Sequence, residues 1–278
     1  MPRHNFTLKN DILNKEFRKK SSFLREKKAL QTLQPHPFIT ELISSYHYEL
    51  KNGSFIGILS IKYYKGIDLF YWIDENNNGS NINFVRYVLK KILLAYHYAE
   101  KYCIFHRDIK PENVILNNDG IVKLIDWELC CFAKYSDKRV GTFEYMAPEV
   151  NNRIVYKCNK ADIWSIGVMT FCLSTGRRPY MCLNSLSSDD DDITYKDLLL
   201  EHIYLKNWKQ FWQHHEKEKN FPQLNINLKR CIELMLQKDP KDRPSIEELM
   251  QNCFFIDDHF QASSVVRHLK NKTLKCMV

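Results

Sequence analysis

The sequence lacks long apolar runs, a signal peptide and paired cysteines. No apolar run approaches the ~20 residues that a helix needs to cross a bilayer, and Met1-Pro2-Arg3-His4-Asn5 has no signal-like apolar stretch. The nine cysteines include no Cys-x-x-Cys pair. An odd, scattered set is typical of free thiols in a reducing compartment rather than of disulfides or a zinc site. We therefore expect a soluble cytoplasmic protein, with the nucleus as the alternative location, and no membrane association.

Positive charge is concentrated at the start of the chain. The formal net charge is +8, and residues 1–30 hold nine Lys and Arg against three acids. Such a segment can mark a nucleic-acid or membrane surface. We favour a solvated helix face and expect no nucleic-acid partner.

One run of eight residues, His106-Arg107-Asp108-Ile109-Lys110-Pro111-Glu112-Asn113, concentrates an acid, a lysine and an amide in a short loop. Phosphoryl transfer needs this combination: a carboxylate for a hydroxyl proton, a cation beside the moving phosphoryl group, and an oxygen ligand for magnesium. The run therefore predicts a catalytic loop.

Further motifs follow this loop in order. Two short apolar runs flank Asn117-Asn118-Asp119-Gly120, a turn sequence that predicts a hairpin of two strands. The motifs after it are Asp126-Trp127-Glu128, Gly141-Thr142-Phe143-Glu144-Tyr145-Met146-Ala147-Pro148-Glu149, Asp162-Ile163-Trp164-Ser165-Ile166-Gly167-Val168 and Asp239-Pro240-Lys241-Asp242-Arg243-Pro244. Together they resemble eukaryotic protein kinases over roughly residues 6–257. Lys110 and Thr142 resemble the serine/threonine branch, and the whole is similar to the calcium/calmodulin-dependent-kinase-like group.

The resemblance implies an α+β fold with two lobes. We expect a kinase-like domain over 1–257, with a reduced, strand-rich N-lobe and hinge (1–64), a helical C-lobe (65–257), and a basic tail (258–278). Strands are expected at 6–9, 39–48 and 54–63, and helices at 18–34, along a long segment whose apolar face runs from Phe84 to Ala99, and near 161–175, 195–214, 224–237 and 245–252. The acidic run at 189–192 is expected in an exposed insert.

The resemblance assigns roles to the residues of the loop and of the strand end after it. Asp108 would be the catalytic base. Lys110 would neutralise charge on the transferring phosphoryl group. Asn113 and Asp126 would hold magnesium, which prefers hard oxygen ligands.

Further nucleotide-binding residues are implied upstream. Lys9, at the end of the strand at 6–9, looks like the phosphate-contacting lysine, and Glu26 like its partner; the alternatives for the lysine are Lys15, Lys19 and Lys20. Lys62-Tyr63-Tyr64 would form the hinge whose backbone binds adenine. Asp68 would reach the ribose, and Ile115 would lie beneath the adenine.

Some implied roles are structural or regulatory. Glu149 and Arg243 would form a buried ion pair. Arg107 would meet an activation-loop phosphate on Tyr135 or Ser136, or Asp137 as a fixed anion. The residues implied to stack as an apolar spine between the lobes are Leu30, Leu42, His106 and Trp127.

The activity implied is transfer of the γ-phosphoryl group of ATP, with Mg²⁺, to Ser or Thr hydroxyls of a protein substrate. The sequence departs from the family in two places. No Gly-x-Gly-x-x-Gly precedes Lys9, so the family's first two strands and the loop over the phosphates do not fit upstream of it; and Glu128 stands where the family has glycine. Two other interpretations remain: a pseudokinase whose helical lobe binds a protein partner, and a truncated gene model of an active kinase.

Overall fold

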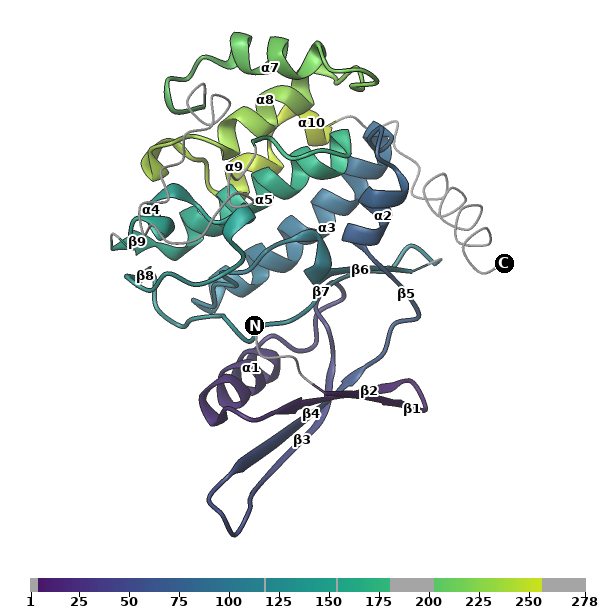
Figure 1. Ribbon diagram of the computed structural model, residues 1–278, viewed down its shortest axis with the longest axis vertical. Coiled ribbons are helices and arrows are strands. Elements are labelled where there is room, and N and C mark those ends of the chain that lie inside the picture. Colours follow the sequence, from purple (N-terminus) through teal and green to yellow (C-terminus); the bar gives the residue numbers. More distant parts are fainter. Residues whose placement is uncertain (1–4, 118, 154, 181–202, 257–278) are drawn as a thin grey trace, which may run out of the picture.

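A four-stranded antiparallel sheet and one helix form the smaller lobe, and helices dominate the larger one (Figure 1). This computed structural model describes residues 5–117, 119–153, 155–180 and 203–256. The small-lobe sheet has the order β1-β2-β4-β3. Its elements are β1 (Phe6–Lys9), β2 (Ile12–Phe17), β3 (Leu42–Glu49), β4 (Phe55–Lys62) and the helix α1 (Lys20–Thr32). The expected two-lobed α+β architecture is confirmed.

Strand β2 is an element that the sequence analysis missed. Asn10 and Asp11 both have positive φ angles, 50° and 58°, and make the two-residue turn of a β1–β2 hairpin. Asn and Asp tolerate this conformation better than other non-glycine residues, so the pair was a readable hairpin signal. Because Asn14, Lys15 and Glu16 interrupt the apolar pattern, the sequence does not predict a strand at Ile12–Phe17. The structure places it in the sheet interior, between β1 and β4.

Helix α1 packs across the sheet through a few buried aromatic contacts. Phe23 is fully buried and lies edge-on to Phe17, with ring centroids 5.8 Å apart. A Cβ atom at position 57 would come within 2.5 Å of the Phe23 ring, so only glycine lets the ring lie this close to β4. This packing positions the next turn of α1, which carries Glu26.

The larger lobe contains the remaining elements. Its helices are α2 (Leu69–Glu75), α3 (Ile82–Lys101), α4 (Pro148–Asn151), α5 (Cys158–Thr175), α7 (Trp208–Glu216), α8 (Ile226–Met235), α9 (Ile246–Met250) and α10 (Cys253–Ile256). Its strands are β5 (Gly66–Asp68), β6 (Val114–Asn117) and β7 (Val122–Leu124) in one sheet, and β8 (Tyr135–Ser136) with β9 (Tyr156–Lys157) in another. The expected hairpin around residues 117–120 is the β6–β7 pair.

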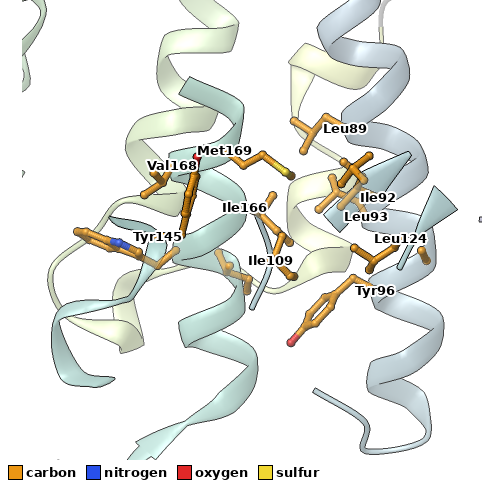
Figure 2. Packing of buried hydrophobic residues seen from close by; sticks show 14 of the residues in the cluster. Leu89, Ile92, Leu93, Tyr96, Ile109, Leu124, Tyr145, Ile166, Val168 and Met169 are labelled. Carbon is orange, nitrogen blue, oxygen red and sulfur yellow. The ribbon is translucent and has the colours of Figure 1, made fainter. Parts of the chain in front are cut away.

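The core of this lobe lies between α3 and α5. Figure 2 shows Ile92 and Tyr96 of α3 facing α5, with Ile109 of the predicted catalytic loop between the two helices. Every residue of α5 from Ala161 to Thr175 is buried, so this helix is surrounded by protein on all sides. The catalytic loop is thus anchored to the core by its own side chain at position 109.

Most of the predicted elements correspond to observed ones, but the helix expected at 195–214 is not continuous, because residues 205–207 are not helical and α7 begins at Trp208. The expected strands at 6–9, 39–48 and 54–63 correspond to β1, β3 and β4, and the long apolar-faced segment is α3. In the range 195–214, residues 195–202 lie outside the described residues, as do the acidic run at 189–192 and the tail at 258–278. Within the described ranges, no helix combines the length and the apolar content that crossing a bilayer requires.

The expected buried ion pair braces the far side of the large lobe. Arg243 is 1% exposed and makes two hydrogen bonds to Glu149, at 2.6 and 2.9 Å. The same guanidinium also donates to the backbone carbonyls of Gln237 and Lys160, each at 2.8 Å. Because all of these acceptors depend on one cation, Arg243 links the region between α8 and α9 to α4, through Glu149, and to α5, through Lys160.

We expect Arg243→Ala to lower the free energy of unfolding by about 3–5 kcal/mol, because it leaves Glu149 as an uncompensated buried charge. Denaturant unfolding measures this loss. Lys206→Ala is the matched control: it breaks the exposed Lys206–Asp242 pair of 2.8 Å and should cost about 0.2–1 kcal/mol. Similar losses in both variants would contradict the bracing role.

Candidate active site

The predicted catalytic loop holds a hydroxyl between an acid and a lysine. Asp108 Oδ1 accepts hydrogen bonds from the backbone N–H and the hydroxyl of Thr142, at 2.7 and 2.8 Å. Lys110 Nζ donates to the same hydroxyl at 2.7 Å and lies 3.3 Å from Asp108 Oδ2. Asn113 Nδ2 donates to the Asp108 carbonyl at 2.8 Å. The structure therefore brings Asp108, Lys110 and Asn113 together, as expected.

Asp162 of α5 holds the backbone of this loop. Its two carboxyl oxygens accept the N–H groups of His106 and Arg107, at 2.9 and 2.8 Å. Burial raises the pKa of Asp162 to about 7, while the two backbone donors favour the ionised form. Arg107 has a φ of +63°, a strained conformation for a residue with a side chain. The clamp from Asp162 explains how that conformation persists.

A second cluster forms around Lys15. The Lys15 ammonium lies 2.7 Å from Glu26 Oε2, 2.8 Å from Asp126 Oδ1 and 3.8 Å from Glu128 Oε2. The lysine side chain is only 4% exposed. Three carboxylates within 4.8 Å of one another form the kind of group that can hold a cation, and here the ammonium of Lys15 lies among them.

The electrostatics of this cluster favour a charged lysine. Burial alone would lower the pKa of Lys15, but the carboxylates of Glu26 and Asp126 raise it above its usual value. Burial would also raise the pKa of Asp126, but Lys15 holds that pKa below its usual value. Burial raises the pKa of Glu26 to about 7, against the opposing effect of Lys15. At neutral pH the cluster therefore contains a cation and an ionised Asp126.

The assignment of Lys9 as the partner of Glu26 is wrong. Lys9 lies in the exposed edge strand β1, whereas Lys15 is buried on the interior strand β2. The turn at Asn10 and Asp11 separates the two positions. Since β1 precedes the lysine strand, one of the two strands expected to be missing upstream of the lysine is present.

The segment Asp126-Trp127-Glu128 shows why glycine is dispensable at its third position. Asp126 carries the left-handed conformation, with φ of +62°, and Glu128 is not among the residues with positive φ. The carboxylate of Glu128 faces Lys15, so the lysine already offsets its repulsion with Asp126. Trp127 is fully buried, with its ring 4.7 Å from that of His106, as the expected spine requires.

Of the three backbone N–H groups in the expected hinge, two are already bonded to backbone carbonyls. Lys62 N–H donates to the Glu41 carbonyl at 2.9 Å, and Tyr63 N–H donates to the Asp11 carbonyl at 2.8 Å. Tyr64 N–H makes no backbone hydrogen bond within the described residues. Of the three predicted hinge residues, Tyr64 is thus the one whose N–H can serve a ligand.

The other two predicted nucleotide contacts lie directly opposite each other. Asp68 of β5 pairs in register with Ile115 of β6. One carboxyl oxygen of Asp68 accepts the Tyr71 N–H at 2.7 Å and so caps helix α2. The second oxygen of Asp68 is therefore the one available to a ligand.

Arg107 contacts the activation segment through a serine. Its Nη1 lies 3.1 Å from Ser136 Oγ, and its Nε donates to the Leu129 carbonyl at 2.8 Å. No ion pair joins Arg107 to Asp137 in the part of the chain that the structure describes. The fixed anion expected at Asp137 is therefore not supported, and Ser136 is the expected partner that contacts Arg107.

We expect Lys15→Met to lower the free energy of unfolding at pH 7.5 by about 3–5 kcal/mol, because it leaves buried Glu26 without a cation. The folded-state pKa of Glu26 lies above its unfolded value, so protonation of Glu26 stabilises the fold as the pH falls below about 7. Without Lys15 this pKa rises further. The difference between variant and wild type should therefore narrow between pH 7.5 and 5.5 in denaturant unfolding.

Lys9→Met is the matched control, since Lys9 is exposed on β1. It should change stability by less than about 0.5 kcal/mol. Equal losses for the two lysines, or a loss at Lys15 that does not change with pH, would contradict this account of the cluster.

Comparison with known proteins agrees with this geometry. The family described as "Protein kinase domain" matches residues 4–255. The serine/threonine-protein kinase KIC1 of Saccharomyces cerevisiae is 29% identical over 195 residues, 69% of this chain and 16% of the yeast protein. The CBL-interacting serine/threonine-protein kinase 20 of Arabidopsis thaliana is 28% identical over 202 residues, 70% and 41% of the two chains.

A third relative, ribosomal protein S6 kinase alpha-2 of Homo sapiens, is 35% identical over 149 residues, 52% of this chain and 19% of the human protein. The chain spans less than half the length of each of these three relatives. The family match covers both lobes and both clusters of the site. The chain belongs to the protein kinase family.

Proposed function

We propose that this domain is a serine/threonine protein kinase that transfers the γ-phosphoryl group of ATP to protein hydroxyls. The observation that carries the proposal is the hydroxyl of Thr142, which lies 2.8 Å from Asp108 Oδ1 and 2.7 Å from Lys110 Nζ. The site therefore already binds an aliphatic hydroxyl between a carboxylate and a cation. An acceptor hydroxyl needs the same surroundings when it attacks a phosphoryl group.

The residues present fit ATP and magnesium. Asn113 uses its amide nitrogen to bind the Asp108 carbonyl, and this contact directs the amide oxygen elsewhere. Asp126 is ionised at neutral pH because Lys15 lowers its pKa. An amide oxygen and a carboxylate are hard ligands of the kind that Mg²⁺ takes. When bound, the metal would neutralise charge on the phosphates of the nucleotide.

Each residue of the proposed active site then has a defined role in the reaction. Asp108 accepts the proton of the substrate hydroxyl, and Lys110 stabilises the charge that develops beside it. Lys15, held by Glu26 at 2.7 Å, presents a cation for the nucleotide phosphates. Asn113 and Asp126 hold the magnesium.

The nucleoside would bind between the lobes. Tyr64 offers a backbone N–H for the adenine edge, and Ile115 offers an apolar side chain for its face. The second carboxyl oxygen of Asp68 would accept a ribose hydroxyl.

A binding module without turnover is the second candidate. The observation in its favour is Glu128, which adds a carboxylate 3.8 Å from Lys15 Nζ. This carboxylate competes with phosphate for the lysine and adds negative charge where phosphates would lie. A pseudokinase of this kind would act by presenting its helical lobe to a protein partner.

A basic groove lies beside the proposed acceptor site. It has a volume of about 670 Å³ and is lined by three cations, Lys138, Arg139 and Arg153, and none of the described residues in its lining is an acid. Gly141, next to Thr142, lines the same groove. Positive charge so close to the acceptor position favours substrates that carry acidic residues near the Ser or Thr.

Asp108→Asn should reduce phosphoryl transfer to a protein substrate by about 10²–10⁴-fold, because it removes the proton acceptor. Transfer of labelled phosphate from ATP measures this. Asp74→Asn, an exposed acid of α2, is the control and should leave the rate unchanged. Equal labelling by wild type and Asp108→Asn would point to a contaminating enzyme and would remove the support for catalysis.

Thermal unfolding with ATP, compared with the transfer assay, separates catalysis from binding. ATP at ~100 times its dissociation constant should stabilise the fold by about 2.7 kcal/mol. Thermal unfolding should show this magnesium-dependent shift for wild type and Asp108→Asn, but not for Asp126→Asn. A shift without any transfer by wild type would favour the binding module.

We expect peptides with an acidic residue beside the acceptor to react faster than matched neutral peptides. The gain should fall by roughly 1.5–5-fold in kcat/KM for Lys138→Ala or Arg153→Ala, since an exposed charge pair contributes about 0.2–1 kcal/mol. Neutral peptides should react equally with all three enzymes, which makes them the control. A preference for basic peptides, or a preference for acidic peptides that the variants leave unchanged, would show that the groove does not recognise acidic residues of the substrate.

A further inference from the structure

Two cysteines from distant parts of the chain meet beside the catalytic loop. The Sγ atoms of Cys131 and Cys158 lie 3.5 Å apart, although 27 residues separate them in the sequence. A disulfide has a bond length of about 2.05 Å. The two sulfurs would thus need to approach by about 1.5 Å to become bonded.

The backbone around both cysteines is held in place. Cys131 exchanges two backbone hydrogen bonds with Phe105, at 2.9 and 3.0 Å. Cys158, the first residue of α5, donates its N–H to the Lys134 carbonyl at 2.9 Å. The β8–β9 pair directly adjoins this contact. The proximity of the thiols therefore follows from paired backbone segments rather than from one side-chain rotamer.

The two thiols differ in reactivity. The hydrogen bond with the Cys158 thiol, helped by the nearby charge of Arg107, lowers the pKa of Cys131 to about 6 in spite of partial burial. Cys131 is also partly exposed, whereas Cys158 is buried. The neighbouring Cys130 is buried, and burial raises its pKa to about 12. Cys131 therefore has the properties of an attacking thiolate, and Cys158 has those of a resolving thiol.

We propose that Cys131 and Cys158 are a reversible oxidation site that a hydroperoxide converts to a disulfide. The Cys131 thiolate attacks one peroxide oxygen, so that an S–O bond forms, the O–O bond breaks, and the leaving oxygen takes a proton to become an alcohol, or water from hydrogen peroxide. Cys158 then attacks the sulfenic sulfur: the S–S bond forms, the S–O bond breaks, and hydroxide leaves with the Cys158 proton as water. Two thiols lose two electrons in total, and the peroxide gains them.

Closure of this disulfide would act on the catalytic loop. Phe105, the backbone partner of Cys131, immediately precedes His106 and Arg107. Arg107 is also bonded to the Leu129 carbonyl and to Ser136 on either side of Cys131. A displacement of about 1.5 Å at the sulfurs would therefore be transmitted through Phe105 to the strained backbone of Arg107, next to Asp108. We expect oxidation to lower phosphoryl transfer, a consequence that rests on the proposed function.

The test treats the full chain with hydrogen peroxide, blocks remaining thiols by alkylation and analyses a non-reducing digest by mass spectrometry. We expect a peptide cross-linked through Cys131 and Cys158 that disappears after treatment with dithiothreitol. Cys158→Ser should abolish the cross-link and leave Cys131 as a sulfenic acid that dimedone traps. Cys130→Ser and Cys253→Ser are the matched controls and should retain the cross-link.

The wild-type digest alone decides the proposal, even if a serine variant does not fold. The proposal is overturned if Cys131 and Cys158 stay unlinked at a peroxide concentration that oxidises the exposed Cys253, or if Cys131 links to Cys130 instead. Transfer activity is read separately: it should fall on oxidation, return with dithiothreitol, and resist peroxide in Cys158→Ser. A cross-link in a protein without transfer activity would support the oxidation site and count only against the proposed function.

Discussion

The buried ammonium of Lys15 joins three segments of the chain, one of them 111 residues away. Lys15 lies on the small-lobe sheet, Glu26 on α1, and Asp126 at the end of the β6–β7 hairpin of the large lobe. Burying such charges is favourable only when each finds its partners. The position of α1 on the sheet and the approach of the two lobes are therefore linked to a single electrostatic arrangement, and a nucleotide that engages Lys15 would act on all three segments at once.

The strained backbone of the site depends on the rigid large lobe. Arg107 and Asp126 both have φ near +60°, a conformation that costs about 1–3 kcal/mol for residues with side chains. Asp162 holds Arg107 by accepting its backbone N–H. The Ile125 N–H donates a hydrogen bond to the Asn113 carbonyl, at 3.0 Å, and so fixes the chain just before Asp126. Since α5 is buried on every side, a shift of this helix to relieve the strain would disturb the packing of the core.

The segment between Asp126 and Glu149 carries residues on which the proposals for substrate charge and for oxidation both depend. Its Thr142 is hydrogen-bonded to Asp108, its Lys138 and Arg139 line the groove beside Asp108, and its Cys131 contacts Cys158 of α5. A movement of this one segment would change all three contacts. Charge in the substrate, a phosphate beside Arg107 and oxidation of the cysteine pair would thus act through the same piece of backbone.

The sequence by itself determined what is local. Asp108, Lys110 and Asn113 stand within six residues of one another, so their spacing alone placed them in one loop, and the 3.6-residue pattern from Phe84 to Ala99 was enough for α3. Only the tertiary structure decided which lysine meets Glu26, because the choice of Lys15 over Lys9 depends on burial in the sheet and on Asp126, 111 residues away. The contact between Cys131 and Cys158 likewise arises where β8 pairs with β9. Spacing along a chain specifies neighbours within a turn or a helix, whereas contacts across lobes are set by packing that no short pattern encodes.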